Sequence, residues 1–248
     1  MLEQIFGAAT PSGKFNLQTS TSKLLLKARL PKGANSFLED FELATADTLI
    51  SATRYSENKG TKEIFVKMNL LDLAEIAAMN EGYINVVTVG NSPFWDIKFS
   101  VELSNAGAVK LSQKDFITMQ FAGMDLFTFV EVYSLGAAVE FDEHLKLSPV
   151  SCAAGAQIKF NCLSHYGVVV PSTLSKLTIT YINGITQEID GKELSLIAPD
   201  VNEIVYVIDG KVVPYNKWRF FPIPTADRAV ITLSAVGFAY LLSSKNYE

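Results

Sequence analysis

The sequence predicts an all-β protein made of two β-sandwiches in tandem, with one or two short helices. Stretches in which apolar and polar residues alternate, as in half-buried strands, recur about every ten residues along the chain. Alternating helix–strand units, typical of Rossmann and TIM-barrel folds, do not occur in the pattern. The motif Leu73-x-x-Ile76-Ala77 reappears as Leu194-x-x-Ile197-Ala198 after 121 residues, close to half of the 248-residue chain. We therefore expect two architectural copies of one unit.

The first half begins with a segment that lacks periodicity. Residues 1–22 are small and polar, and they predict an N-terminal arm. The first sandwich is expected over residues 23–142. Its first strand runs from Leu24 to Leu30, with every second residue apolar, and stops at Pro31. Residues 37–55 predict one or two further strands with a weaker pattern.

A helix of about three turns is predicted directly after Asn69. The Asn69 side chain is suited to cap the first turn, and Asp72 lies near the positive end of the helix dipole. Leu73 and Ile76 lie on one apolar face, and Gly82 is the expected stop.

Strand patterns fill the rest of the chain. Residues 97–103 alternate cleanly between apolar and polar side chains. Residues 143–156 contain a proline, a glycine and several small side chains, and they predict a linker. The second sandwich is expected over residues 157–248. Its last long strand is predicted at 229–236, followed by a short polar tail.

The strongest hairpin signal lies between Lys176 and Ile189. Apolar residues alternate with threonines up to Tyr181, and Asn183-Gly184 predicts a two-residue type I′ turn. A short helical turn is expected after the hairpin, ending at Ala198. No other segment of the chain has so clear a local pattern.

Composition excludes several classes of function. The net charge is −5 and only four residues are arginine, so a direct nucleic-acid ligand is not expected. Cys152 and Cys162 form neither a disulfide framework nor a CxxC zinc motif. The N-terminus lacks a signal-peptide pattern, and the longest uncharged run is shorter than a membrane span. A hydrophobic content of 48% predicts a well-packed globular protein, and a mean hydropathy of +0.20 predicts that partners cover some of its apolar surface.

The sequence predicts no catalytic, cofactor-binding or metal-ligating residue, and hence no enzyme and no cofactor. His144 and His165 are the only histidines, and neither lies in a metal or catalytic motif. Neighbouring carboxylates are candidates for a glycosidase pair, but they fall where solvated turn residues normally lie. These candidates are Glu39-Asp40, Asp142-Glu143, and Asp190 with Glu193.

Aromatic side chains are expected mostly in the core, because phenylalanine outnumbers tyrosine and tryptophan together. Phe94-Trp95 and the segment from Tyr215 to Trp218 lie near prolines. They are candidates for interface anchors.

The hairpin segment from Leu177 to Gly184, followed by Gly191-Lys192-Glu193-Leu194, is similar to a segment of double jelly-roll major capsid proteins. Those proteins form the coats of tailless, membrane-containing icosahedral bacteriophages of the corticovirus and tectivirus type. The two β-rich halves and the polar N-terminal segment resemble that family as well. The chain is short for it.

The resemblance implies that both sandwiches are jelly rolls and that the chain forms a homotrimer. Its six jelly rolls would make a pseudo-hexagonal capsomer, and capsomers would assemble the virion shell after synthesis in the host cytoplasm. Implied partners are neighbouring capsomers, other virion proteins, and an internal membrane reached by the N-terminal arm. No direct contact with nucleic acid is implied.

Two alternatives remain open from the sequence. One is a β-sandwich module that binds carbohydrate or a receptor, as in a viral spike or a lectin, which predicts an exposed tryptophan or tyrosine patch. The other is a glycoside hydrolase, which predicts two carboxylates facing one another in a cleft.

Overall fold

The computed structural model divides the chain into two compact units. Unit 1 comprises residues 1–145, 202–214 and 245–248, and unit 2 comprises residues 146–201 and 215–244. The structure describes residues 1–104, 107–151, 157–161, 167–190, 193, 205–214, 217–222, 230–234 and 238–246.

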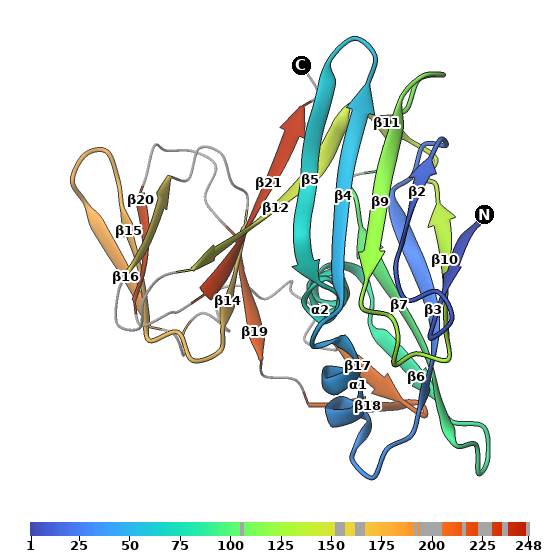
Figure 1. The fold of residues 1–248 in the computed structure, drawn as a ribbon. Coiled ribbons are helices and arrows are strands. Elements are labelled where there is room, and N and C mark those ends of the chain that lie inside the picture. Colours follow the sequence, from blue (N-terminus) through green and yellow to red (C-terminus); the bar gives the residue numbers. More distant parts are fainter. Residues whose placement is uncertain are drawn as a thin grey trace. The chain divides into compact units, whose positions relative to one another are not determined.

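Two sheets face each other in unit 1 (Figure 1). The larger has the strand order β1 (Leu2–Phe6), β10 (Phe129–Leu135), β3 (Lys23–Pro31), β7 (Phe94–Glu102), β6 (Ile84–Val87), β17 (Tyr206–Ile208) and β18 (Lys211–Val213). The smaller has the order β2 (Gly13–Leu17), β9 (Phe116–Ala122), β4 (Leu49–Ser56) and β5 (Gly60–Asn69). A separate parallel pair consists of β8 (Ala108–Val109) and β11 (Glu140–Phe141).

The core of unit 1 lies between these two sheets. Phe6 of β1 stacks on Phe121 of β9 with ring centroids 4.9 Å apart, so side chains of both sheets meet there. On β3, Leu24, Leu26, Ala28 and Leu30 are buried while the residues between them point outward. The alternation read from the sequence therefore decides which face of β3 enters the core.

Two helices lie in the described part of the chain, α1 (Phe37–Thr45) and α2 (Leu70–Glu81). The prediction of α2 is confirmed: the Asn69 side chain accepts hydrogen bonds from the backbone N–H groups of Leu71 and Asp72. The prediction of strand at the start of 37–55 is wrong, because α1 occupies that segment. Ser36 and Glu39 form a capping box that satisfies the orphan N–H groups of its first turn.

A hairpin from the second half of the chain extends the large sheet of unit 1. β17 pairs in parallel with β6, with Tyr206 opposite Ile84. The Tyr206 hydroxyl donates a hydrogen bond of 2.6 Å to the Glu75 carboxylate on α2. The backbone N–H of Thr88 donates to the carboxylate of Asp209 in the turn between β17 and β18.

Unit 2 contains two four-stranded sheets. One has the order β12 (Glu143–Ser151), β21 (Phe238–Asn246), β14 (Gly167–Pro171) and β19 (Trp218–Pro222). The other has the order β13 (Ile158–Asn161), β20 (Val230–Ser234), β15 (Lys176–Thr180) and β16 (Thr186–Asp190). Buried residues of both sheets form one hydrophobic cluster, including Val168 and Phe221 from the first and Leu177 and Ile231 from the second.

The two units share one strand order. Eight strands in each unit are numbered from 1 to 8 along the chain: β1, β2, β3, β4, β5, β7, β9 and β10 in unit 1, and β12, β13, β14, β15, β16, β19, β20 and β21 in unit 2. In both units one sheet then contains strands 1-8-3-6 and the other 2-7-4-5. In unit 1 the strands β6, β17 and β18 extend the large sheet beyond β7, which is the sixth strand in this count.

Several segments differ from the sequence expectation. Residues 1–22, expected as an arm, contain β1 and β2, which pair with β10 and β9 inside unit 1. The expected linker at 143–156 begins with strand β12, and residues 152–156 lie outside the described residues. The segment expected as a polar tail contains β21, whose first five residues, Phe238–Leu242, are apolar.

The hairpin of β15 and β16 is confirmed, but its turn differs from the expected type I′. Gly184 N–H donates to Tyr181 O, Tyr181 N–H donates to Ile185 O, and only Gly184 has a positive φ, of 82°. This is a three-residue loop that ends in a left-handed glycine. The Asn183 backbone does not adopt a positive φ, and its side chain accepts a hydrogen bond of 3.0 Å from Ile185 N–H. The helical turn expected at 192–198 falls outside the described residues, apart from Glu193.

Candidate functional site

Of the histidines and cysteines considered from the sequence, only His144 lies within the described residues. His144 is buried on β12. His165, Cys152 and Cys162 lie outside the described residues. Among the described residues, no group of three His, Cys, Asp or Glu side chains is arranged to hold a metal ion.

The carboxylates of Glu39 and Asp40 accept hydrogen bonds at the N-terminal end of α1. Hydrogen bonds from the backbone and then the hydroxyl of Ser36 lower the pKa of Glu39. Asp40 is buried and accepts from Gly33 N–H at 2.8 Å and from the Trp95 indole at 3.1 Å. Trp95, a predicted interface anchor, therefore fixes the N-terminal end of α1, and its ring meets Phe37 edge-on.

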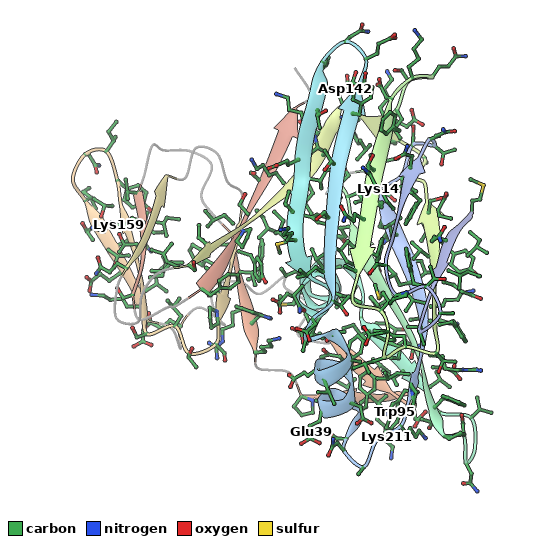
Figure 2. All side chains as sticks on the ribbon, viewed as in Figure 1. Lys14, Glu39, Trp95, Asp142, Lys159 and Lys211 are labelled. Atoms are coloured by element: carbon green, nitrogen blue, oxygen red, sulfur yellow. The ribbon has the colours of Figure 1, made fainter. Side chains whose placement is uncertain are left out.

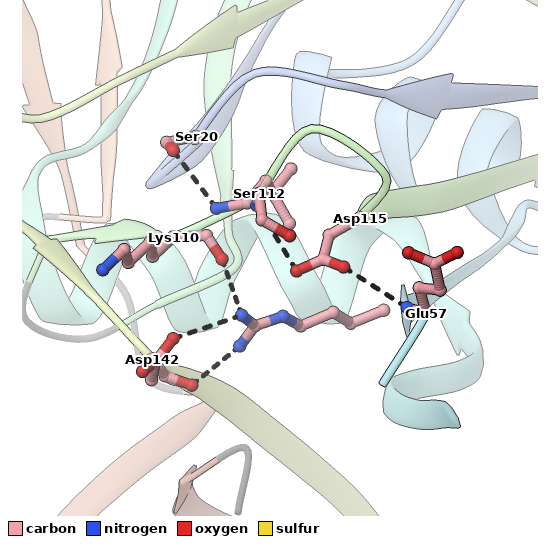
Figure 3. Close-up of polar contacts among 8 residues, drawn as sticks. Ser20, Glu57, Lys110, Ser112, Asp115 and Asp142 are labelled. Atoms are coloured by element: carbon pink, nitrogen blue, oxygen red, sulfur yellow. Dashed lines mark hydrogen bonds and ion pairs between the residues drawn. The ribbon is translucent and has the colours of Figure 1, made fainter. Parts of the chain in front are cut away.

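The exposed Asp142 contacts the buried guanidinium of Arg54 (Figure 3). Only 1% of Arg54 is exposed, and its guanidinium donates to Lys110 O at 2.6 Å and to Asp142 O at 2.7 Å. Beside it, Asp115 accepts from the backbone N–H groups of Ser112 and Glu57. The contacts of Arg54 join β4 to the segment before β9 and to the residue between β11 and β12.

Asp190 and Glu193, the last carboxylate pair, belong to a turn in which Glu193 N–H donates to Asp190 O at 2.9 Å. Each carboxylate pair considered from the sequence thus lies at a cap, a loop junction or a turn.

The outer face of the large sheet of unit 1 carries a groove that the sequence reasoning missed. Its volume is about 320 Å³, and its lining comes from β3, β6, β7 and β10 and from the loop after β6. Most of the lining is apolar, with two lysines and two carboxylates among it. The lining residues are Lys27, Ala28, Asn85, Val87, Val89, Asp96, Ile97, Lys98, Phe129 and Glu131.

Ion pairs and ring contacts order the charged residues around this groove. Arg29 donates to Asp96 at 2.7 Å, and this hydrogen bond raises the pKa of Arg29. The Arg29 guanidinium also lies 5.3 Å from the centre of the Phe129 ring. The Tyr133 hydroxyl donates to Glu131 at 2.7 Å, and this bond raises the pKa of Tyr133. The groove therefore has apolar walls and fixed charges of both signs.

Large apolar side chains are exposed at and beside the groove. Val89 in its lining is 70% exposed. On the edge strand β1, Leu2 and Ile5 pair with Tyr133 and Glu131 and are 46% and 50% exposed. Exposed apolar side chains on a sheet face are typical of an interaction surface when polar residues surround them. The register that brings these residues together joins positions more than 100 residues apart, which no local sequence pattern reveals.

The sequence matches no protein-family model and no curated protein. None of the described helices is long and apolar enough to span a bilayer.

Proposed function

We propose that the chain is a double jelly-roll coat protein, which forms trimers and assembles a virion shell. The observation that carries the proposal is the strand order 1-8-3-6 and 2-7-4-5, repeated in both units. A jelly roll is a sandwich of eight antiparallel strands in two sheets, and it is common in viral capsid proteins and in lectins. Fold alone does not determine function, so a surface suited to assembly must add support.

The groove on the large sheet of unit 1 supplies that support. Its apolar walls favour burial, and its charges, Lys27 and Lys98 with Asp96 and Glu131, balance. A surface that carries both signs can complement another copy of the same chain without net repulsion. In a three-fold ring the groove would meet a different surface of the next copy, since cyclic trimers use heterologous contacts.

The proposed capsomer contains six β units from three chains. Neighbouring capsomers and other virion proteins are the proposed partners. The proposal uses no extended arm, because β1 and β2 pair within unit 1. An obligate interface of several thousand Å² would cover exposed apolar residues such as Val89 and Ile5.

The test is the oligomeric state of the purified chain and of two variants. Val89→Glu places a charge at the groove, and Leu43→Glu is the matched control, because Leu43 on α1 is 66% exposed and lies outside the groove. Light scattering coupled to size exclusion should give a trimer for the unchanged chain and for Leu43→Glu, but smaller species for Val89→Glu. A monomeric unchanged chain at high concentration would overturn the proposal, as would equal effects of both substitutions.

A further inference from the structure

The small sheet of unit 1 has a second groove on its outer face, of about 310 Å³. Its lining contains no aliphatic side chain larger than the methyl group of threonine. Four lining residues carry hydroxyl groups other than tyrosine, one carries an amide, two are aromatic and one is cationic. The lining residues are Lys14, Ser51, Thr53, Tyr55, Thr61, Phe116, Thr118 and Gln120.

The pairing of β2, β9, β4 and β5 arranges these side chains in three rows across the sheet. The first row is Lys14, Gln120 and Ser51. The middle row includes Thr118 and Thr53, and the last row is Phe116, Tyr55 and Thr61. Adjacent strands are about 4.8 Å apart, and Phe116 and Gln120 are about 14 Å apart along β9. The groove therefore has polar side chains arranged in rows across the sheet, with aromatic residues at one end and a cationic residue at the other.

Much of the hydrogen-bonding capacity of these rows is directed outward. The side chains of Thr53, Thr61 and Gln120 have no hydrogen-bond partner within the part of the chain that the structure describes. Ser51 Oγ accepts from Lys67 N–H at 2.9 Å and keeps its hydrogen available to donate. Thr118 donates to the Asn16 amide oxygen at 2.8 Å, which leaves its oxygen able to accept. A ligand rich in hydroxyl groups would match these donors and acceptors.

The aromatic end offers a stacking surface. The Tyr55 and Phe116 rings lie 4.8 Å apart with an interplanar angle of 24°, and both are half-buried. Mutual stacking fixes their orientation and leaves outer ring faces for the C–H face of a sugar ring. Because the pair is held in place before binding, little side-chain entropy remains to be lost.

The cationic end selects the charge of the ligand. Lys14, labelled on β2 in Figure 2, is exposed and has no ion-pair partner among the described residues. No acidic residue contributes to the lining. A carboxylate at this end would therefore meet one unpaired cation. The acidic Glu63 of β5 lies opposite Thr53 in the middle row, away from this end.

We propose that this groove binds an acidic oligosaccharide of two or three sugar units. One sugar stacks on Tyr55 and Phe116, the middle row hydrogen-bonds its hydroxyl groups, and a uronic or sialic acid carboxylate reaches Lys14. The 14 Å between the rows at the two ends matches about that length of chain. The site lies on the opposite sheet from the proposed assembly groove, so binding does not depend on assembly.

The test titrates the full chain with 3′-sialyllactose and with trigalacturonate, and uses lactose as the neutral comparison. Calorimetry or chemical-shift mapping gives the affinities. Lys14→Gln removes the cation, and Thr53→Val removes a hydroxyl while keeping a β-branched side chain. Lys159→Gln is the matched control, because Lys159 is an exposed lysine of unit 2 that lines neither groove. Thermal unfolding of each variant separates lost binding from lost folding.

We expect at least one acidic probe to bind more tightly than lactose. Lys14→Gln should weaken that binding about tenfold, the effect of one charge-assisted contact, while Lys159→Gln changes nothing. Thr53→Val should weaken it without a change in the melting temperature. The inference is overturned if neither acidic probe binds, if lactose binds equally well, or if Lys14→Gln and Lys159→Gln have the same effect. None of these outcomes changes the oligomeric mass, so the coat proposal is tested separately.

Discussion

The Tyr206 hydroxyl lies 2.6 Å from the Glu75 carboxylate, to which it donates across 131 residues of sequence. Both side chains are buried, and Tyr206 also meets the Phe37 ring edge-on. Burial, followed by the charge and hydrogen bond of Glu75, raises the pKa of Tyr206 far above its usual value. This contact joins the returning strand β17 to helix α2.

Tyr206→Phe should destabilise unit 1 by about 1.5–3 kcal/mol, the range for a hydrogen bond to a charged group. Tyr133→Phe is the control, since its hydroxyl also donates to a carboxylate but on a half-exposed face. Urea unfolding at neutral pH measures both. A cost for Tyr206→Phe no larger than for Tyr133→Phe would show that the buried contact adds nothing.

The same contact predicts a pH dependence at the alkaline end. The pKa of Tyr206 is higher in the folded chain than in the unfolded chain, where it is about 10. The stabilisation is therefore complete below pH 10 and declines as the pH rises above it. The unfolding free energy of the unchanged chain should fall more steeply in this window than that of Tyr206→Phe. Parallel curves would contradict the account.

Asp209, in the turn between β17 and β18, joins this hairpin to Thr88 through two hydrogen bonds. Hydrogen bonds from the Thr88 hydroxyl and then its backbone N–H lower the pKa of Asp209. A lowered pKa gives stabilisation that is present above the usual value of about 3.9 and is lost as the pH falls through the folded value. Thr88→Val should reduce stability at pH 6 but not at pH 2, as measured by hydrogen exchange of β17. A constant difference at both pH values would argue against this role.

Arg54 predicts a large cost for a single substitution. Arg54→Met keeps the aliphatic packing but removes the donors to Lys110 O and Asp142 O, which should destabilise unit 1 by about 2–5 kcal/mol. Lys114→Met removes the exposed pair with Glu57 and should cost less than about 1 kcal/mol. Thermal unfolding compares the two. Similar melting temperatures would mean that the hydrogen bonds of the buried Arg54 add no more stability than an exposed ion pair.

The loop between β15 and β16 distinguishes the observed turn from type I′. Gly184→Ala forces a side chain into the left-handed region and should cost about 1–2 kcal/mol. Asn183→Ala removes only the hydrogen bond to Ile185 N–H and should cost about 0.5–1 kcal/mol. In a type I′ turn both positions would need a positive φ, so a larger cost at Asn183 would contradict the observed loop.

Local patterns predicted the elements better than the boundaries. β3 and α2 follow from alternation and from the Asn69 cap. α1 has a readable signal, the Ser36–Glu39 capping box, which predicts a helix in a segment where the weak alternation of residues 37–55 predicts strands. The return of β17 to unit 1 could not be predicted, because a strand's alternation says nothing about which edge it joins.

The two grooves of unit 1 could not be predicted from the sequence, for the same reason. Period-two alternation shows that Thr53 and Thr118 point outward, but their proximity depends on the pairing of β4 with β9. Likewise, Phe129 and Val89 come to one groove through three intervening pairings of the large sheet. Sheet register between distant strands is set by the whole core.

Electron microscopy of the purified, concentrated chain tests the central claim most directly. The account predicts particles with three-fold symmetry and a hexagonal outline, each with three times the 27.2 kDa mass of one chain, that tile into closed shells or sheets. Single chains of 27.2 kDa at every concentration, with no ordered assembly, would contradict it.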